Sequence, residues 1–487
     1  MLILKSKRKA RRFAGILFII GLFIIWAVFF FRSVKAANME WSYSASDYYS
    51  VMSYSSPGNI LDRSGEILLD GSREGWKWNE GAAYNSAYAS LIGPDIKLTA
   101  VSKSTMLGAG AKKLLGIGSN TIYNPLKILL PLPVSGDDIR MTTDTSLQLK
   151  AMELLADYPT SSIFMYNYKT GEVLTSVSKP TFDPITLEGI VMDENNKYMS
   201  FSDKQGKGIN KNIAYLRPPG STMKSVTAAI ALDYDESLAD FSCKCPGTAT
   251  IDGVKVICHS THGTVKSMQS ALDKSCNIYF ATLASQIPND VFEAGLVDCG
   301  FNSVVSYGEY NVADGVFGEV DKLNGLSSID KLYGAFGQAT CRTTPLQMAV
   351  IYGYIASGGD SVLPYFFEID GKEHETEETF AMFGSSTAET LADMLEQSVS
   401  NGSGSKAYIE GMNVIGKSGT AQWGDGREDT AWFIAAIRNE DYPFVVCVCL
   451  DESSRGGSSA APFARKMLQS AIDLTNSENA IDEIPEE

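Results

Sequence analysis

A long uncharged stretch near the N-terminus constrains the fold of this chain most. It extends from Phe13 to Phe31 and follows six basic residues, with no acidic residue before it. As a helix rising ~1.5 Å per residue, the stretch spans roughly the hydrocarbon core of a bilayer. It is longer than the apolar region of a cleaved secretory signal, about 7–15 residues, so we favour a retained anchor. The pattern predicts a cytoplasmic leader at 1–12, a single transmembrane helix at 13–31 and an extracytoplasmic remainder, held at the cell membrane.

The remainder of the chain is acidic. The 487 residues have a formal net charge of −16, although the leader and the apolar stretch contain basic residues and no acidic ones. A surface of this sign repels phosphate backbones, and we find no basic patch with interleaved aromatic residues. We therefore expect no nucleic-acid partner.

Composition divides the outer part into two domains and a tail. Residues 32–155 are rich in Ser, Gly, Tyr and Asn and show no sustained helical period, which predicts a small, turn-rich domain. Residues 156–475 contain longer apolar segments, which indicate a second domain with a larger hydrophobic core. Residues 476–487 are acidic and poor in apolar groups, which is typical of a disordered tail.

The second domain is predicted to have a mixed α/β fold, an antiparallel sheet flanked by helices. Three apolar segments follow one another with short turns between them, which favours antiparallel pairing. Strands are expected at 162–168, 172–177, 412–422, 430–437 and 442–450. Helices are expected at 146–156, 221–234, 267–286, 345–356, 386–399 and 461–474.

Three short motifs occur in order in the second domain: Ser221-Thr222-Met223-Lys224, Ser275-Cys276-Asn277 and Lys417-Ser418-Gly419-Thr420. Each is a weak signal alone, because Ser-x-x-Lys occurs five times in this chain. The copy at Ser221 is distinguished by its context. It follows Pro218-Pro219-Gly220 and opens an apolar run at helical spacing, which places Ser221 and Lys224 on one helix face. An isolated motif of this kind is more often a serine cap beside a solvated lysine.

A serine and a lysine on one helix face can perform nucleophilic catalysis. A serine hydroxyl is a poor nucleophile until a base removes its proton. Lys224 can serve as that base if burial and a second cation such as Lys417 lower its pKa. A place in the first helical turn also directs the helix dipole and backbone N–H groups toward a developing oxyanion.

In this order the three motifs resemble those of penicillin-binding proteins. The similarity extends to Tyr215, to Gly337-Gln338 with 344–349, and to 416–422 with Ala431-Trp432-Phe433. Upstream it includes Thr143-Asp144, 170–172, Asp183-Pro184 and 58–65, the last being similar to the N-terminal signature of the class B subgroup. One departure is Pro57, where those proteins usually have arginine. The resemblance implies the penicillin-binding transpeptidase fold at 156–475, after a non-catalytic pedestal domain at 32–155.

The resemblance also implies a role for each motif residue. The implied catalytic residues are Ser221 as nucleophile, Lys224 as base, Ser275 and Asn277 as the second wall, and Lys417. The implied substrate-binding residues are Ser418, Gly419 and Thr420. The backbone N–H groups of Ser221 and Thr420 would form the oxyanion hole. No cofactor is required for this catalysis.

The implied activity is that of a peptidoglycan D,D-transpeptidase, which cross-links stem peptides of the bacterial cell wall through an acyl-enzyme on Ser221. Expected partners are stem peptides, β-lactams as covalent inhibitors, the membrane through the N-terminal helix, and a polytopic lipid-linked glycosyltransferase. The alternatives are a D,D-carboxypeptidase, a serine β-lactamase, and a non-enzymatic β-lactam sensor or divisome scaffold. Intact motifs, one apolar stretch and no dedicated deacylating base favour the transpeptidase.

Two of the three histidines lie within a cysteine cluster between positions 243 and 276. Cys245, Cys258, His262 and Cys276 are ligand types of a tetrahedral structural zinc site, and a disulfide between Cys245 and Cys258 is the main alternative. Free buried thiols are a third interpretation. Because Cys276 lies inside the second motif, a metal there would support the wall of the site. It would have no catalytic role, since four protein ligands leave no open position.

Overall fold

The computed structural model describes residues 15–16, 18–27, 55–72, 75–79, 81–93, 103–116, 134–186, 208–318, 320–321, 325–369, 381–402, 404–423, 428–451 and 459–482. Within the predicted anchor, residues 15–16 and 18–27 are helical. The leader at 1–12 lies outside the described residues. In the part of the chain that is described, no helix combines the length and apolar character needed to cross a membrane.

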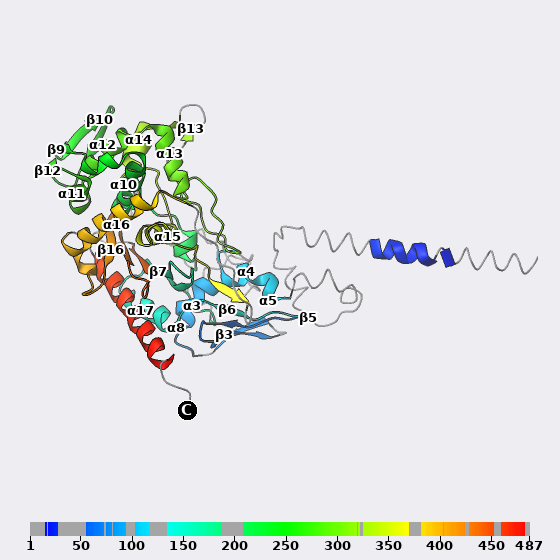
Figure 1. Cartoon of the computed structure of the whole chain (residues 1–487). Coiled ribbons are helices and arrows are strands. Elements are labelled where there is room, and N and C mark those ends of the chain that lie inside the picture. Colours follow the sequence, from blue (N-terminus) through cyan, green and yellow to red (C-terminus); the bar gives the residue numbers. More distant parts are fainter. Residues whose placement is uncertain are drawn as a thin grey trace, which may run out of the picture.

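A five-stranded antiparallel sheet forms the centre of the second domain (Figure 1). Its order is β16-β17-β18-β7-β8, so β16 lies at one edge. The strands are β16 (Val414–Ala421), β17 (Thr430–Ile437), β18 (Phe444–Leu450), β7 (Ser161–Asn167) and β8 (Val173–Lys179). The predicted antiparallel sheet is confirmed, with 412–422 forming one strand that begins at Val414.

The sheet separates two hydrophobic cores. Ile434 and Ala436 of β17 pack into the larger core, whereas Phe433 and Ala435 pack into the other. This alternation follows because successive side chains of a strand point to opposite faces. Helices cover both faces, which explains why β17 and β18 are apolar along their whole length. The mixed α/β prediction is confirmed.

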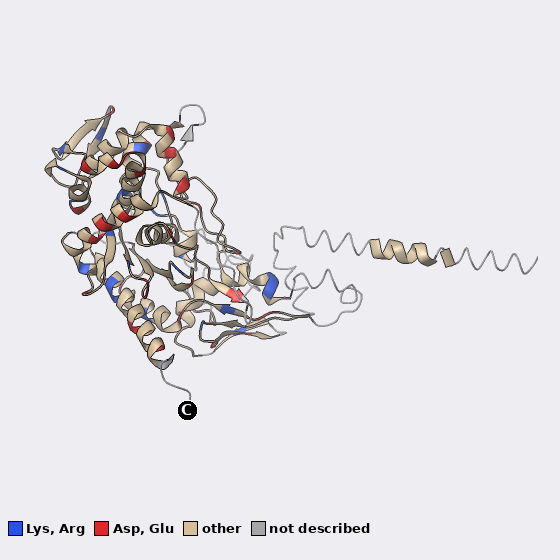
Figure 2. Cartoon of the chain, in the orientation of Figure 1, with Lys and Arg blue, Asp and Glu red and all other residues tan. Residues whose placement is uncertain are grey.

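The helices of this part have well-defined starts. Helix α15 begins at Pro345, because Thr344 accepts a hydrogen bond from the Gln347 N–H and proline suits the first helical position. The helices are α8 (Thr145–Leu154), α9 (Lys211–Ala214), α10 (Met223–Tyr234), α11 (Met268–Asp273), α12 (Asn277–Ser285), α13 (Asn289–Asp298), α14 (Ser328–Gly334), α15 (Pro345–Ala356), α16 (Ser385–Ser400) and α17 (Ala461–Asp482). Short 3₁₀ turns are η2 (Gly220–Thr222), η3 (Glu236–Asp240) and η4 (Ser405–Ala407). Figure 2 shows acidic residues spread over α13 and α16.

Two short antiparallel strand pairs lie beside α12. One pairs β9 (Cys243–Cys245) with β12 (Gly263–Val265), and the other pairs β10 (Thr248–Ile251) with β11 (Val254–Ile257). A further pair is formed by β13 (Val320–Asp321) and β14 (Gly325–Leu326). These strand pairs bring the cysteines at 245 and 258 close to Cys276, the N-cap residue of α12.

The N-terminal region forms a second sheet of five strands, in the order β15-β6-β2-β3-β4. Its strands are β2 (Ile60–Leu61), β3 (Ile67–Ser72), β4 (Gly75–Trp78), β6 (Ile139–Met141) and β15 (Phe367–Ile369). β1 (Ser55–Ser56) pairs with β5 (Val134–Ser135), and short helices are α3 (Asn85–Ile92), α4 (Met106–Ala109) and α5 (Ala111–Leu114). β15 comes from the second half of the sequence, and α8 packs on the central sheet. The two regions are therefore interleaved near their junction.

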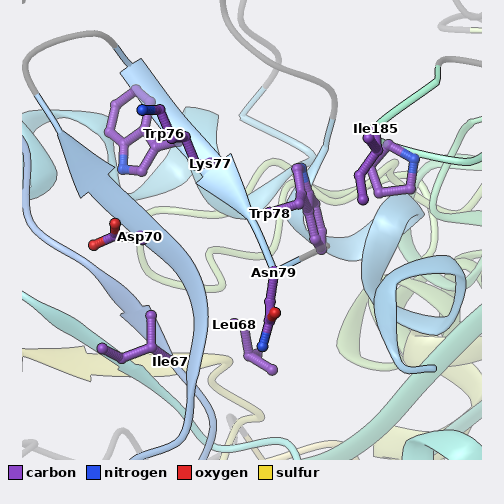
Figure 3. A pocket seen from close by; sticks show the side chains of 9 residues that line it. Ile67, Leu68, Asp70, Trp76, Lys77, Trp78, Asn79 and Ile185 are labelled. Atoms are coloured by element: carbon purple, nitrogen blue, oxygen red, sulfur yellow. The ribbon is translucent and has the colours of Figure 1, made fainter. Parts of the chain in front are cut away.

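A groove of about 630 Å³ lies beside β4 in the N-terminal region (Figure 3). Trp78 and Ile185, which lie close together in Figure 3, line it together with Asp70 and Lys77. None of the residues of the three motifs lines this groove. It is separate from the catalytic motifs.

Two predicted elements are corrected by the structure. The segment 267–286 is two helices, because Ser275 has a left-handed backbone (φ 49°) and Cys276 caps a new helix. The helix predicted at 461–474 continues to Asp482, so residues 476–482 are helical and are no disordered tail. Extending a helix that is already formed avoids the cost of nucleating a new one, which is consistent with a helix that continues past its buried part.

Candidate active site

Ser221 lies in the 3₁₀ turn η2, which leads directly into α10. The next helical turn brings the fully buried Lys224 beneath it, with Nζ 2.9 Å from Ser221 Oγ. The predicted pairing of serine and lysine on one face is therefore present. This distance suits transfer of the hydroxyl proton to an unprotonated amine.

The second motif surrounds the same amine from the opposite side. Lys224 Nζ donates to the Ser275 carbonyl at 2.6 Å and lies 3.1 Å from Ser275 Oγ. It also donates to Asn277 Oδ1 at 2.8 Å. The left-handed backbone at Ser275 turns both the carbonyl and the hydroxyl toward Lys224. A helix continuing through this segment would not present both groups.

The third motif lies on the edge strand β16. Lys417 is buried, and its Nζ lies 3.3 Å from Ser275 Oγ. Ser418 and Thr420 are partly exposed, whereas Gly419 between them is buried. The structure thus brings all three motifs together, although their residues are far apart in sequence.

Each of the two lysines of the site has a pKa lowered from that of an exposed lysine. Burial lowers the pKa of Lys224 well below its ordinary value, and the nearby charge of Lys417 lowers it further. Burial lowers the pKa of Lys417 to about 8, although Asp273 partly opposes this shift. Both shifts favour a neutral amine, and Lys224 is the lysine whose Nζ lies within hydrogen-bonding distance of Ser221 Oγ.

The serine turn packs directly against β16. Gly220 has a left-handed backbone (φ 55°), and a Cβ atom there would lie 2.5 Å from the carbonyl oxygen of Thr420. A Cβ atom at Gly419 would lie 2.8 Å from the Pro219 carbonyl oxygen. Glycine at both positions therefore permits backbone contact between the serine turn and the strand.

The cysteine and histidine cluster adjoins the second motif. The ligand atoms of Cys245, Cys258, His262 and Cys276 all lie within 4.8 Å of one another. All eight cysteines are free thiols, so the predicted disulfide between Cys245 and Cys258 is wrong for this structure. Instead, both sulfur atoms face the His262 ring, with Sγ–Nδ1 distances of 3.5 and 3.6 Å. Cys447 and Cys449 are buried free thiols in β18.

Several groups at the site carry no local signal in the sequence. The Ile257 carbonyl accepts a hydrogen bond from Asn277 Nδ2 at 3.2 Å. Arg217 and Asp451 form a buried ion pair beside the serine turn. A pair separated by 234 residues could not be recognised from either segment alone.

Comparison with known proteins agrees with this geometry. Residues 161–469 match the family model described as the penicillin binding protein transpeptidase domain. The chain belongs to this family. The family prediction is thus confirmed, and the matched range begins with β7 and ends within α17.

Two members of this family align with about two thirds of the chain. Penicillin-binding protein 3 of Bacillus subtilis is 28% identical over 359 residues, which are 69% of this chain and 51% of that protein. Peptidoglycan D,D-transpeptidase PbpA of Mycolicibacterium smegmatis is 27% identical over 338 residues, 64% of this chain and 67% of that protein. The chain thus spans about half the length of the first of these relatives.

Solved structures of penicillin-binding proteins share the fold. Penicillin-binding protein A from M. tuberculosis, in a ceftriaxone acyl-enzyme complex, has a TM-score of 0.72 at 20% identity and covers 88% of this chain and 99% of that chain. The D,D-transpeptidase domain from Eggerthella lenta has a TM-score of 0.69 at 21% identity, covering 86% and 99%. The predicted transpeptidase fold is confirmed.

Proposed function

We propose that this protein is a peptidoglycan D,D-transpeptidase that cross-links stem peptides of the bacterial cell wall. The observation that carries the proposal is the position of Lys224 Nζ, 2.9 Å from Ser221 Oγ and 2.8 Å from Asn277 Oδ1. A buried amine of lowered pKa beside a partly exposed serine is the arrangement that nucleophilic acyl transfer requires.

The reaction follows from the roles of the three motifs. Ser221 Oγ attacks the carbonyl carbon of the penultimate D-alanine, and its proton passes to Lys224 Nζ. The oxyanion is stabilised by the backbone N–H groups of Ser221 and Thr420. The C–N bond to the terminal D-alanine then breaks, and its nitrogen takes a proton through Ser275 Oγ. An amine of a second stem peptide attacks the resulting ester and regenerates the Ser221 hydroxyl.

Charge on the third motif supports the substrate class. Lys417, with the hydroxyl groups of Ser418 and Thr420, provides a cation and donors for the terminal carboxylate of a D-Ala-D-Ala peptide or of a β-lactam. A β-lactam presents the same carboxylate and a strained amide to Ser221. Relatives carry the name peptidoglycan D,D-transpeptidase, and the M. tuberculosis structure is a β-lactam acyl-enzyme, which supports the same chemistry here.

Acylation of Ser221 can be tested with fluorescent penicillin on the full chain in detergent. We expect label on the wild type and none on Ser221→Ala. Ser328→Ala is a matched control, because Ser328 and Lys331 form another Ser-x-x-Lys on α14, where Lys331 Nζ donates to Ile287 O and Asn289 Oδ1. Equal labelling of Ser221→Ala and wild type would contradict the proposal.

The acceptor distinguishes the transpeptidase from its rivals. A pentapeptide donor supplied with a D-amino acid should give the exchanged peptide, detected by mass spectrometry. Hydrolysis alone would favour a D,D-carboxypeptidase, and rapid release of penicilloyl product would favour a β-lactamase. A protein that binds no penicillin would be a scaffold.

We further propose a class B arrangement, in which the N-terminal segment anchors the catalytic domain outside the cell membrane. The supporting observations are the basic residues before 13–31 and the exposed apolar side chains along helical residues 18–27, including Phe18 and Ile19. Membrane fractionation with alkaline extraction tests the anchor, and release into the soluble fraction would contradict it. Co-purification with a polytopic lipid-linked glycosyltransferase tests the predicted partner.

We also propose that Cys245, Cys258, His262 and Cys276 bind a structural zinc ion. In structural zinc sites the Zn–S bond is about 2.3 Å long and the Zn–N bond about 2.0–2.1 Å. Tetrahedral geometry with these bonds places a sulfur about 3.6 Å from a nitrogen and two sulfurs about 3.8 Å apart. The Sγ–Nδ1 distances here are 3.5 and 3.6 Å, and Cys258 Sγ lies 4.0 Å from Cys276 Sγ. These three separations are within about 0.2 Å of the tetrahedral values, and the four ligand atoms all lie within 4.8 Å of one another, which supports the proposal.

Hydrogen bonds from groups around the four candidate ligands also support a zinc site. His262 Nε2 lies 2.7 Å from Ser260 Oγ, a partner that fixes which nitrogen faces the sulfurs. The backbone N–H groups of Asn277 and Tyr279 donate to Cys258 Sγ and Cys276 Sγ, as suits thiolates. Because Asn277 also contacts Lys224, the metal would support the second wall and would not take part in the chemistry.

Metal content of the purified full chain tests the zinc proposal directly. We expect one zinc ion per chain, measured by inductively coupled plasma mass spectrometry, and loss of that ion in Cys245→Ser. Cys243→Ser is the matched control, since Cys243 lies on the same strand outside the four-residue cluster. Metal-free wild-type protein with six titratable thiols under denaturing conditions would instead reveal a disulfide.

A further inference from the structure

The segment leading to Ser221 is tied to the sheet by a buried ion pair. The Arg217 guanidinium donates to both carboxylate oxygens of Asp451, from Nε and Nη2 at 2.9 Å each. The Arg217 side chain is fully buried and that of Asp451 is 6% exposed. Such a two-bond contact between planar groups fixes orientation as well as distance.

The pair joins two parts of the catalytic site. Arg217 precedes Ser221 by four residues, and its backbone exchanges two hydrogen bonds with Thr343 at 2.9 and 2.8 Å. Asp451 directly follows β18 and accepts a hydrogen bond from Thr430 Oγ1 at 2.9 Å. Thr430 is the register partner of Ala421, the last residue of β16. One carboxylate thus connects the approach to Ser221 with the end of the strand that carries Lys417.

The serine turn and β16 are in direct backbone contact, so the distance between them can change little. The close contacts of Gly220 with the Thr420 carbonyl and of Gly419 with the Pro219 carbonyl leave no space for a Cβ atom between the serine turn and β16. The oxyanion of the proposed reaction would lie between the N–H groups of Ser221 and Thr420, which belong to these two segments. A displacement of either segment therefore changes both donor distances together.

Stability alone does not account for the pair. A second cation, Lys211, lies 3.6 Å from Asp451 Oδ2 and is also buried, so two positive groups face one carboxylate. Taking such a group of charges out of water is costly, and apolar residues of similar volume are often at least as stabilising. What the charged arrangement provides, and an apolar one does not, is a fixed geometry.

We propose that the Arg217–Asp451 ion pair is a positioning device that sets the distance between the serine turn and β16, and thereby the rate of Ser221 acylation. Neither residue touches the reacting atoms. The inference rests on the proposed acyl transfer and assigns to it residues outside the three motifs.

The test is Asp451→Asn, which keeps the volume and an acceptor for Thr430 but removes the charged two-bond contact. Stopped-flow acylation of the full chain by a chromogenic cephalosporin separates the non-covalent Kd from the acylation rate constant. We expect that rate constant to fall by about 10- to 100-fold, since a 1 Å misplacement can cost about 100-fold. The Kd should stay within about twofold and the pH midpoint of acylation should not move.

Two further variants keep the test decisive. Arg217→Lys retains the buried charge but loses the two-bond contact, and it should show the same selective loss of acylation rate. Arg438→Lys alters an ion pair with the exposed Asp393 and should leave acylation unchanged. A lowered Tm with an acylation rate constant within about twofold of wild type in both Asp451→Asn and Arg217→Lys would overturn the inference. A shifted pH midpoint would also overturn it, because it would indicate an electrostatic effect on Lys224.

Failure of the inference and failure of the proposed function give different results. If the wild-type chain is not acylated at Ser221, the proposed function is wrong and this inference falls with it. If the wild type is acylated and the variants react equally fast, only the positioning role is overturned.

Discussion

Replacing Gly220 by alanine should slow acylation as well as destabilise the fold. Gly220 precedes the nucleophile and has a left-handed backbone (φ 55°). An added Cβ atom would lie 2.5 Å from the Thr420 carbonyl oxygen, whereas ordinary contacts begin at 3.4 Å. The serine turn and β16 must therefore separate by about 0.9 Å to relieve the contact.

The expected magnitude follows from that displacement. A shift of about 1 Å in a reacting group can cost about 100-fold in rate, so we expect acylation of Gly220→Ala to fall by about that factor. The backbone conformation adds a cost to stability of roughly 1–2 kcal/mol for a residue with a Cβ atom. In a domain of this size that cost lowers the Tm by several degrees.

Gly308→Ala is the matched control. Gly308 has a similar backbone (φ 61°), but a Cβ atom there meets nothing within 4 Å. Both variants should lose stability through the backbone strain, Gly220→Ala more because of its contact with Thr420, and only Gly220→Ala should lose acylation rate in a stopped-flow assay with a chromogenic cephalosporin. If Gly220→Ala reacts within about threefold of Gly308→Ala, the contact between the serine turn and β16 does not control the reaction.

Three further predictions concern the lysines and the metal. Burial lowers the pKa of Lys417 to about 8, so its positive charge is lost as the pH rises through that value. The non-covalent affinity for a β-lactam carboxylate should therefore fall over the same pH range. A Kd that stays constant from about pH 7 to 9 would contradict this. Asn277→Ala removes an acceptor of Lys224 Nζ and the bond to the Ile257 carbonyl, and should slow penicillin labelling by about 100-fold. A zinc chelator should lower the Tm of wild type and of Cys243→Ser but not of Cys245→Ser; equal melting of wild type with and without chelator would argue against a structural ion.

The sequence predicts the central elements well where local signals agree. Helix 345–356 and strand 430–437 have the predicted bounds, because a Thr-Pro start marks the helix and an unbroken apolar run marks a strand buried on both faces. The first motif is indicated for a related reason, because its spacing places Ser221 and Lys224 on one helix face. The other two motifs are indicated only by their resemblance to those of penicillin-binding proteins.

The predictions of secondary structure are wrong where tertiary contacts override the local preference of the chain for a helix or a strand. The segment 267–286 has helical character throughout, yet its backbone turns at Ser275 so that two groups of that residue reach Lys224. The strand at 367–369 joins the N-terminal sheet through a partner 226 residues distant in the chain, Met141 with Phe367, which no local pattern indicates. Local reasoning thus fails at the functional site, as is expected where function competes with regular structure.

The position of the Lys224 amine between three segments explains why contacts between distant parts of the chain are present at the site. This amine is held between the serine turn and the second wall, and burial, together with the charge of Lys417 on β16, lowers its pKa. These three segments are distant in sequence, so each needs its own attachment to a common frame. The serine turn has the Arg217–Asp451 pair, β16 is hydrogen-bonded along β17, and the second wall adjoins the cysteine cluster. Changes that move a wall should therefore alter the acylation rate at a constant pH midpoint, whereas changes at Lys417 should move the midpoint itself.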